Sequence, residues 1–225
     1  MITLPCYLPV DVMAKNIKLI IFDLDGTLVD AYAAITRSFN YTMGKLNYPA
    51  QGTSIIRRAV GWGDKNLLRP FIKPKDLKKA LVIYRRDHKT ALIEESRLFP
   101  KAAVLLRRLK EKGCKLAVAS NRPTKFSLLL IRHLGIKKYF DAILCADKIN
   151  HGKPHPEIII KIMRRFSVKP AEAIYVGDMA IDAQAGRRAK VNTVIVTTGS
   201  STKQEIKKEK PYRVIRRIRE LLKIL

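Results

Sequence analysis

The stretch that decides the fold is Ile17-Lys18-Leu19-Ile20-Ile21-Phe22-Asp23-Leu24-Asp25-Gly26-Thr27-Leu28. Its first six residues are mostly apolar and predict a buried strand, and Gly26 predicts a turn just beyond the end of that strand. Asp23 and Asp25 alternate along an extended chain, so both carboxylates should project to the same side. Two carboxylates this close repel each other, which predicts either a bound cation or a shared proton.

Four further apolar runs follow, separated by amphipathic helical patterns. The predicted strands cover residues 115–119, 142–145, 173–176 and 193–197, and the predicted helices cover 101–112, 123–134, 154–166 and 179–190. Alternating strands and helices are typical of parallel β-α-β units, so we expect an α/β fold with a doubly wound parallel sheet. The active sites of such sheets lie beyond the carboxyl ends of the strands.

Residues 32–96 interrupt the alternation, because they show helical patterns at 33–46, 54–60 and 75–95 and no convincing strand. We therefore expect a small all-helical cap domain, residues 32–96, inserted after the first strand of a core formed by residues 1–31 and 97–225. At the C-terminus a last helix is predicted, with one apolar face: Val214, Ile215, Ile218, Leu221, Leu222 and Leu225. Such a face usually docks on the sheet, the alternative being a membrane surface.

Length and composition exclude several classes of protein. The 225 residues suit one large domain, or one domain with a smaller insertion, and the 47% hydrophobic fraction excludes a mainly disordered chain. No apolar run reaches the roughly 18 residues of a membrane span. The N-terminal arm lacks a signal-peptide pattern, and Cys6, Cys114 and Cys145 lack metal spacing. We expect a cytoplasmic protein, a monomer or a homodimer, without membrane contact.

The chain is very basic, with 45 Lys and Arg against 19 Asp and Glu and a formal net charge of +26. Residues 1–31 carry two basic and four acidic side chains, and residues 171–202 carry three of each, so these are its least basic parts. The surplus is either a solvated basic surface or a non-specific contact for a polyanion such as RNA or DNA. No basic motif with interleaved aromatics predicts sequence-specific recognition.

Polar residues follow four of the strand-like runs and should meet at one edge of the sheet: Asp23 and Asp25, Ser120 and Asn121, Lys153, and Asp178 and Asp182. Mg²⁺ prefers carboxylate and carbonyl oxygens and often shares its site with a substrate phosphate. A hydroxyl, backbone amides and an ammonium group suit the other phosphate oxygens. The set therefore predicts phosphoryl transfer, in which an Asp can be the nucleophile.

With these four motifs in order, the chain resembles the haloacid dehalogenase-like phosphohydrolases, and within them the phosphoglycolate-phosphatase-like branch with a helical cap, from about residue 18 to residue 225. The resemblance implies that Asp23 is the nucleophile that forms an aspartyl-phosphate. It implies that Asp25 is the general acid and base, and that Asp23, the carbonyl of Asp25 and Asp178 bind Mg²⁺. Ser120, Asn121 and Lys153 would hold the phosphoryl group, and Asp182 would orient Lys153 or a metal-bound water.

Two features of the pattern narrow the expected reaction. Asp25 favours phosphoryl chemistry over halide displacement, and Asp182 favours hydrolysis over the related mutases. Arg122 replaces the more usual Lys after Asn121, which predicts altered contacts near the leaving group. In the cap, Trp62 is either a lid over the substrate or a core residue, and Arg57 is a candidate for binding a substrate carboxylate.

The sequence thus predicts a Mg²⁺-dependent phosphatase for a small anionic phosphomonoester, with phosphoglycolate leading by resemblance. Alternatives within the family are an inorganic pyrophosphatase, a nucleotidase or a sugar-phosphate phosphatase. An alternative from a different class is a basic nucleic-acid-associated protein with a vestigial phosphatase site.

Overall fold

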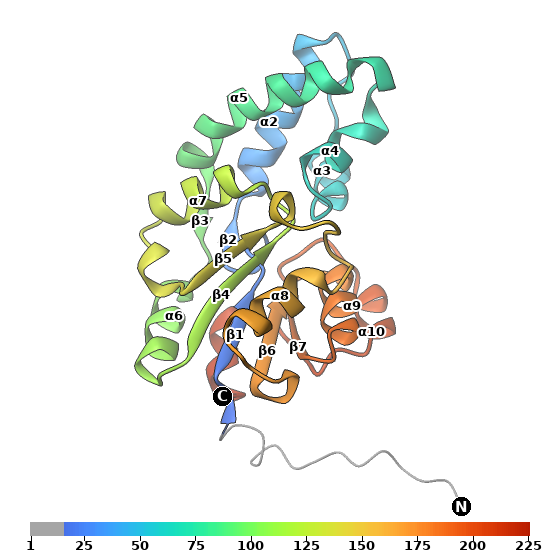
Figure 1. Cartoon of the computed structure of the whole chain (residues 1–225). Coiled ribbons are helices and arrows are strands. Elements are labelled where there is room, and N and C mark those ends of the chain that lie inside the picture. The colour runs from blue at the N-terminus through green and yellow to red at the C-terminus, as the bar shows by residue number, and fades with distance from the viewer. Residues whose placement is uncertain (1–15) are drawn as a thin grey trace, which may run out of the picture.

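The computed structural model describes residues 16–225, which form a six-stranded parallel sheet with a group of helices above one edge (Figure 1). The N-terminal arm with Cys6 lies outside the described residues. The strand order is β5-β4-β1-β6-β7-β8, so β1, the strand directly before Asp23, lies in the middle of the sheet. The strands are β1 (Leu19–Phe22), β4 (Lys115–Ser120), β5 (Ala142–Cys145), β6 (Ala173–Gly177), β7 (Asn192–Val196) and β8 (Arg213–Ile215).

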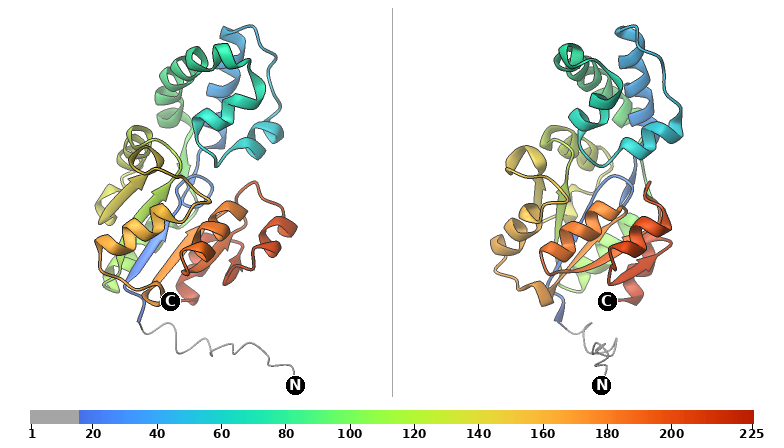
Figure 2. Two further views of the ribbon diagram at one scale, coloured as in Figure 1. Left: turned by 45° about the vertical axis from the view of Figure 1, so that its right-hand side comes forward. Right: turned by 90° about the vertical axis from the view of Figure 1, so that its right-hand side faces the viewer.

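Helices cover both faces of this sheet, as the turned views in Figure 2 show. Leu19 and Ile21 of β1 pack with the helices at residues 157–165 and 180–188, whereas Ile20 and Phe22 pack with those at residues 102–111, 124–133 and 218–223. A strand buried on both faces must be apolar at every position, which explains the unbroken run in β1. The helices of the core are α6 (Ala102–Glu111), α7 (Thr124–His133), α8 (Glu157–Arg165), α9 (Ala180–Arg188) and α10 (Lys203–Lys208), with short 3₁₀ turns η4 (Lys137–Tyr139), η5 (Ala146–Lys148) and η6 (Pro170–Glu172).

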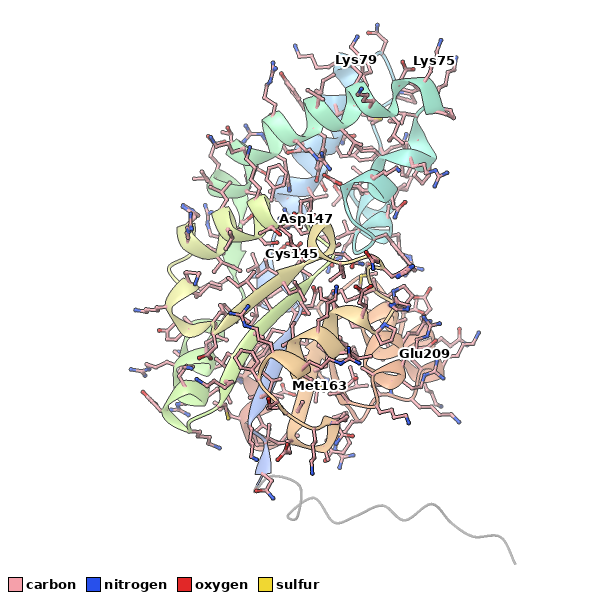
Figure 3. All side chains as sticks on the ribbon, in the orientation of Figure 1. Lys75, Lys79, Cys145, Asp147, Met163 and Glu209 are labelled. Carbon is pink, nitrogen blue, oxygen red and sulfur yellow. The ribbon has the colours of Figure 1, made fainter. Side chains whose placement is uncertain are left out.

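The helical insertion, residues 32–96, lies above the carboxyl ends of the strands (Figure 1). It contains α2 (Tyr32–Lys45), α3 (Thr53–Ala59), α4 (Asp64–Leu68) and α5 (Leu77–Glu95), with 3₁₀ turns η2 (Arg69–Phe71) and η3 (Pro74–Asp76). The chain enters through β2 (Val29–Asp30) and returns through β3 (Arg97–Leu98), which pair antiparallel. Lys75 and Lys79 mark its far end, away from the sheet (Figure 3).

The prediction of a C-terminal helix is wrong. Residues 213–215 form β8, which adds to the sheet beside β7, and η7 (Ile218–Lys223) follows as a 3₁₀ helix. Ile215, Ile218 and Leu221 are buried in the core, while Val214 is 50% exposed. The apolar residues therefore dock on the sheet as expected, but the open edge of β7 offers backbone hydrogen bonds that favour a strand there. Within residues 16–225 no helix has the length and apolar character needed to cross a membrane.

Candidate active site

The carboxyl ends of the central strands bring the predicted site residues together. Asp23 directly follows β1, Ser120 ends β4, and Asp178 directly follows β6. Lys153 reaches this edge from the loop before α8, and its Nζ lies 2.7 Å from Oδ1 of Asp23 and 2.7 Å from Oδ1 of Asp182. All five side chains are buried. The edge thus holds an ammonium between two carboxylates, next to a third carboxylate.

Asp182 has no oxygen left for a ligand. Its Oδ1 accepts hydrogen bonds from Lys153 and, at 2.6 Å, from the hydroxyl of Tyr175. Its Oδ2 accepts from the backbone N–H groups of Asp178 and Met179 at 3.2 and 3.0 Å. Because both oxygens are occupied within the protein, the contacts suit a residue that positions Lys153.

Asp178, in contrast, has a free oxygen. Thr27 donates a hydrogen bond to Oδ1 at 2.8 Å, but Oδ2 is buried and has no hydrogen-bond partner within residues 16–225. Two glycines keep the space beside Oδ2 open, since a Cβ on Gly26 or on Gly199 would stand 2.2 Å from that atom. A buried, unpartnered carboxylate oxygen is costly unless a cation binds it. Carboxylate oxygens of Asp23 and Asp178 lie within 4.8 Å of each other, so these two residues fit a hard divalent cation, with Asp182 beside them as the partner of Lys153.

The pKa values reflect this crowding of buried acids. Burial raises the pKa of Asp23 to about 7, although the nearby Lys153 opposes the shift. Burial and the charges of Asp182 and Asp23 raise the pKa of Asp178 well above its usual value. Burial alone would lower the pKa of Lys153, but the charges of Asp182 and Asp23 outweigh it and raise that pKa. The protein without metal therefore holds carboxylates that resist ionisation, whereas a bound cation would favour their charged forms.

These shifts predict how stability without metal depends on pH. A carboxyl group with a raised pKa contributes stability below its unfolded pKa, near 4, and that contribution is lost as pH rises through the folded pKa. Asp178→Asn mimics the protonated acid, so in EDTA we expect it to raise the Tm by about 3–6 °C at about pH 8 and by less at about pH 5. Thermal unfolding of both proteins at both pH values measures this. A lower Tm for the variant at both values would contradict it.

Ser120 and Asn121 connect the loops around the site. The hydroxyl oxygen of Ser120 accepts a hydrogen bond from the backbone N–H of Arg122 at 3.2 Å. The amide of Asn121 donates to the carbonyls of Lys153 and Gly61 at 3.0 and 2.9 Å, and accepts from the N–H of Lys153 at 2.8 Å. The side chain of Asn121 therefore links both the loop that carries Lys153 and the helical insertion to the end of β4.

Asp25 pairs with Arg122, which in turn contacts His88, and sequence reasoning did not identify the role of either residue. Nε and Nη2 of Arg122 donate to the two oxygens of Asp25 at 2.8 and 2.7 Å, and Nη1 lies 2.7 Å from Nε2 of His88 on α5. The sequence signalled Arg122 only as a departure from the usual Lys. His88 carried no signal, because it lies 34 residues away in a helix of the insertion.

The structure does not bring Arg57 or Trp62 into the site. Nη2 of Arg57 donates to the carbonyl of Thr198 at 2.7 Å, and its guanidinium stacks over the ring of Tyr32. The hydrogen bond from Arg57 to Thr198 therefore links the insertion to the loop after β7. Trp62 is 44% exposed, so it is not a core residue. Its neighbours Gly61 and Gly63 line the cavity beside Asp23, but Trp62 itself does not.

Comparisons with known proteins agree with this geometry. Residues 20–196 match the haloacid dehalogenase-like hydrolase family. The chain is 34% identical over 186 residues to the phosphoglycolate phosphatase of Rhodobacter capsulatus, covering 80% of this chain and 84% of that protein. It is 30% identical over 182 residues to the phosphoglycolate phosphatase of Aquifex aeolicus, covering 81% and 85%. The crystal structure of a predicted phosphoglycolate phosphatase from Haemophilus somnus superposes with a TM-score of 0.89, at 27% identity over 92% of this chain and 97% of that chain. The chain therefore belongs to the haloacid dehalogenase-like hydrolase family, in the branch that contains these phosphoglycolate phosphatases.

Proposed function

We propose that the protein is a Mg²⁺-dependent phosphatase that hydrolyses a small phosphomonoester through an aspartyl-phosphate. The observation that carries the proposal is the pairing of Asp23 with Lys153 beside the unpartnered Oδ2 of Asp178. Phosphoglycolate is the leading substrate, because the curated relatives are named for it.

The residues have the chemistry that such a reaction needs. An oxygen of Asp23 attacks phosphorus and the bond from phosphorus to the ester oxygen breaks. Asp25, whose two oxygens both accept from Arg122 in this structure, must first give up one of these contacts and take up a proton, which it then donates to the departing alkoxide. Asp25 then takes a proton from a water molecule, whose oxygen attacks the phosphorus of the aspartyl-phosphate. This step releases phosphate and restores the carboxylate of Asp23. Lys153 and the hydroxyl of Ser120 lie where they can bind phosphoryl oxygens throughout.

Asp23, Asp178 and the backbone carbonyl of Asp25 are the groups that would hold Mg²⁺. When bound, the ion would neutralise charge on the phosphoryl group. The least basic stretches of the chain, residues 1–31 and 171–202, supply all three ligands, which suits a cation site within a chain of net charge +26.

We further propose a division into a core, residues 1–31 and 97–225, and a cap, residues 32–96. The contacts of Asn121 with Gly61 and of Arg57 with Thr198 support closure of the cap over Asp23. Closure would keep bulk water from the aspartyl-phosphate. The free thiols of Cys114 and Cys145 suit the reducing cytoplasm. Contact with RNA or DNA stays a prediction from charge alone.

An assay with a generic aryl phosphate tests the proposed function. We expect turnover with Mg²⁺, none with excess EDTA, and recovery when Mg²⁺ is restored. A panel of phosphoglycolate, pyrophosphate, nucleotides and sugar phosphates then ranks the substrates by kcat/KM. No turnover of any of them with Mg²⁺ would contradict the proposal, and would leave the nucleic-acid-associated alternative, which retention on RNA or DNA at low salt would support.

A further inference from the structure

Arg122 is a buried cation at the junction of the sheet and the helical insertion. Its side chain is 7% exposed, and its Nε and Nη2 hold both oxygens of Asp25. Nη1 faces Nε2 of His88, which α5 supplies from the insertion. Such a position is unusual for an arginine, because a buried guanidinium is costly unless its charge and its N–H groups are used.

His88 accepts a hydrogen bond from Arg122 but is itself uncharged, so it does not offset the positive charge of the guanidinium. Burial and the adjacent guanidinium lower the pKa of His88 well below its usual value, so the imidazole is neutral. Nδ1 lies 3.2 Å from the hydroxyl oxygen of Ser38, which suits a proton on Nδ1 and a lone pair on Nε2. Asp25 is therefore the residue that offsets the charge of Arg122, and His88 holds the guanidinium from the other side as a neutral acceptor.

The guanidinium still has donors to spare. Arginine has five N–H donors, and the contacts with Asp25 and His88 use three of them. One N–H remains on Nη1 and one on Nη2. A carboxylate that approaches these two atoms can accept from one or both, in the geometry for which arginine is best suited.

These donors border the place where a leaving group must sit. Arg122 lines a cavity of about 50 Å³ together with Asp23, Asp25 and Ser120, so a phosphomonoester whose phosphorus faces Asp23 would place its ester substituent there. The remaining side chains of the lining are mixed: Ile35, Val60, Leu67, Pro123 and Phe126 are apolar, whereas Asp64, Tyr84, His88 and Asn121 are polar. Among the described residues that line this cavity, Arg122 is the only cation.

The size of the cavity limits the substituent. It is about a third of the roughly 150 Å³ apolar cavity that accepts a benzene molecule. A two- or three-carbon group therefore matches the cavity in this conformation better than a nucleoside or a hexose, and a larger substituent would have to extend beyond it. The three carboxylates that line the cavity already have basic partners, since Asp23 pairs with Lys153, Asp25 with Arg122 and Asp64 with Arg85. The spare N–H groups of Arg122 therefore favour a substituent that carries a negative charge.

We propose that Arg122 is the specificity-determining residue of the site, and that it binds a carboxylate carried by the leaving group of a short phosphomonoester. This inference rests on the proposed phosphatase function and narrows its substrate class to small phosphorylated hydroxy acids. His88 and Asp25 hold the guanidinium in place, so recognition of the carboxylate requires the helical insertion to be closed on the core.

The test compares a carboxylate substrate with a neutral one. For wild-type protein, kcat/KM for phosphoglycolate should exceed that for ethyl phosphate by about 100-fold or more, because the analogue leaves the buried donors unpaired. Arg122→Met should bring this ratio down to within about threefold of one. The matched control is Arg37→Met, since Arg37 pairs with Glu94 and Glu95 inside the insertion and does not line the cavity. Its ratio should stay at the wild-type value.

Other results would overturn the inference. Arg122→Met would do so if it lowered kcat/KM for both substrates by the same factor, because Arg122 would then act only by positioning Asp25. A wild-type ratio near one would do the same. Turnover of aryl phosphate in either case would leave the proposed function intact, whereas no turnover of any phosphoester would overturn both.

A second measurement needs no variant and covers the case in which Arg122→Met does not fold. Glycolate and glycolamide have nearly the same shape, but only glycolate carries a carboxylate. Glycolate should inhibit hydrolysis of aryl phosphate by wild-type protein at concentrations about tenfold or more below those needed for glycolamide. Equal inhibition by the two compounds would count against a carboxylate site.

Discussion

Asp23→Asn is expected to lower kcat by at least about 10⁴-fold with every phosphoester, and to leave the fold intact. The amide of Asn has the shape of the carboxylate and can keep a contact with Lys153, which lies 2.7 Å from Oδ1 in the wild-type protein. It lacks the negative oxygen that must attack phosphorus. The loss should therefore fall on kcat, because the groups that bind the substrate remain.

Two measurements check this prediction. Steady-state turnover of an aryl phosphate gives the ratio of kcat values, and acid quenching with a ³²P-labelled substrate traps a phosphoenzyme in wild-type protein only. Asp141→Asn is the matched control, because Asp141 pairs with Lys110 and Lys115 just before the start of β5, at the opposite edge of the sheet. The control should keep wild-type turnover. Activity of the Asp23 variant above about 1% of wild type, or label on the variant, would show that another residue is the nucleophile.

Lys153→Met is expected to cost both activity and stability. The ammonium is buried between Asp23 and Asp182, so its removal leaves two buried carboxylates without their cation. Breaking a buried ion pair by removing one partner typically costs about 3–5 kcal/mol. Turnover should fall by about 10³-fold, since the charge that binds the phosphoryl oxygens is lost as well.

Chemical unfolding in EDTA measures the free energy of unfolding of this variant. Tyr175→Phe is the matched comparison, because it removes a hydrogen bond from a neutral donor to the same oxygen of Asp182 and leaves all three charges in place. That change should cost about 1.5–3 kcal/mol, less than the loss of the ammonium. If Lys153→Met were no less stable than Tyr175→Phe, the ammonium would not be the group that compensates the buried carboxylates.

Much of the fold and of the site follows from local pattern. The strands that end near Asp23, Ser120 and Asp178 were predicted from apolar runs, and strand order then places these ends together at the middle of the sheet. Such runs are informative because a central parallel strand is buried on both faces. Edge strands carry a weaker signal. The half-exposed Val214 of β8 fits a helical pattern equally well, and only pairing with β7 shows which structure forms.

The contacts between the insertion and the core had no local signal. Arg122 and His88 meet across 34 residues, and Arg57 reaches Thr198 across 141 residues. Neither pair has a helical or strand spacing from which contact can be inferred. Arg57, a candidate from the sequence for binding a substrate carboxylate, donates in the structure to a backbone carbonyl of the core. The cation that lines the cavity is Arg122, at the end of a core strand.

The sequence by itself determined the α/β fold, the helical insertion and the four polar segments at the strand ends. Hydrophobic periodicity is a local property of the sequence, and strands that pair in parallel bring their carboxyl ends to the same edge of the sheet. Only the tertiary structure decided which of these groups are free to act. In the folded protein both oxygens of Asp182 accept hydrogen bonds from protein groups, whereas Oδ2 of Asp178 has no partner within the described residues. Arg122 lies between Asp25 and His88. The physical reason is that hydrogen-bond satisfaction and burial depend on neighbours far apart in the chain.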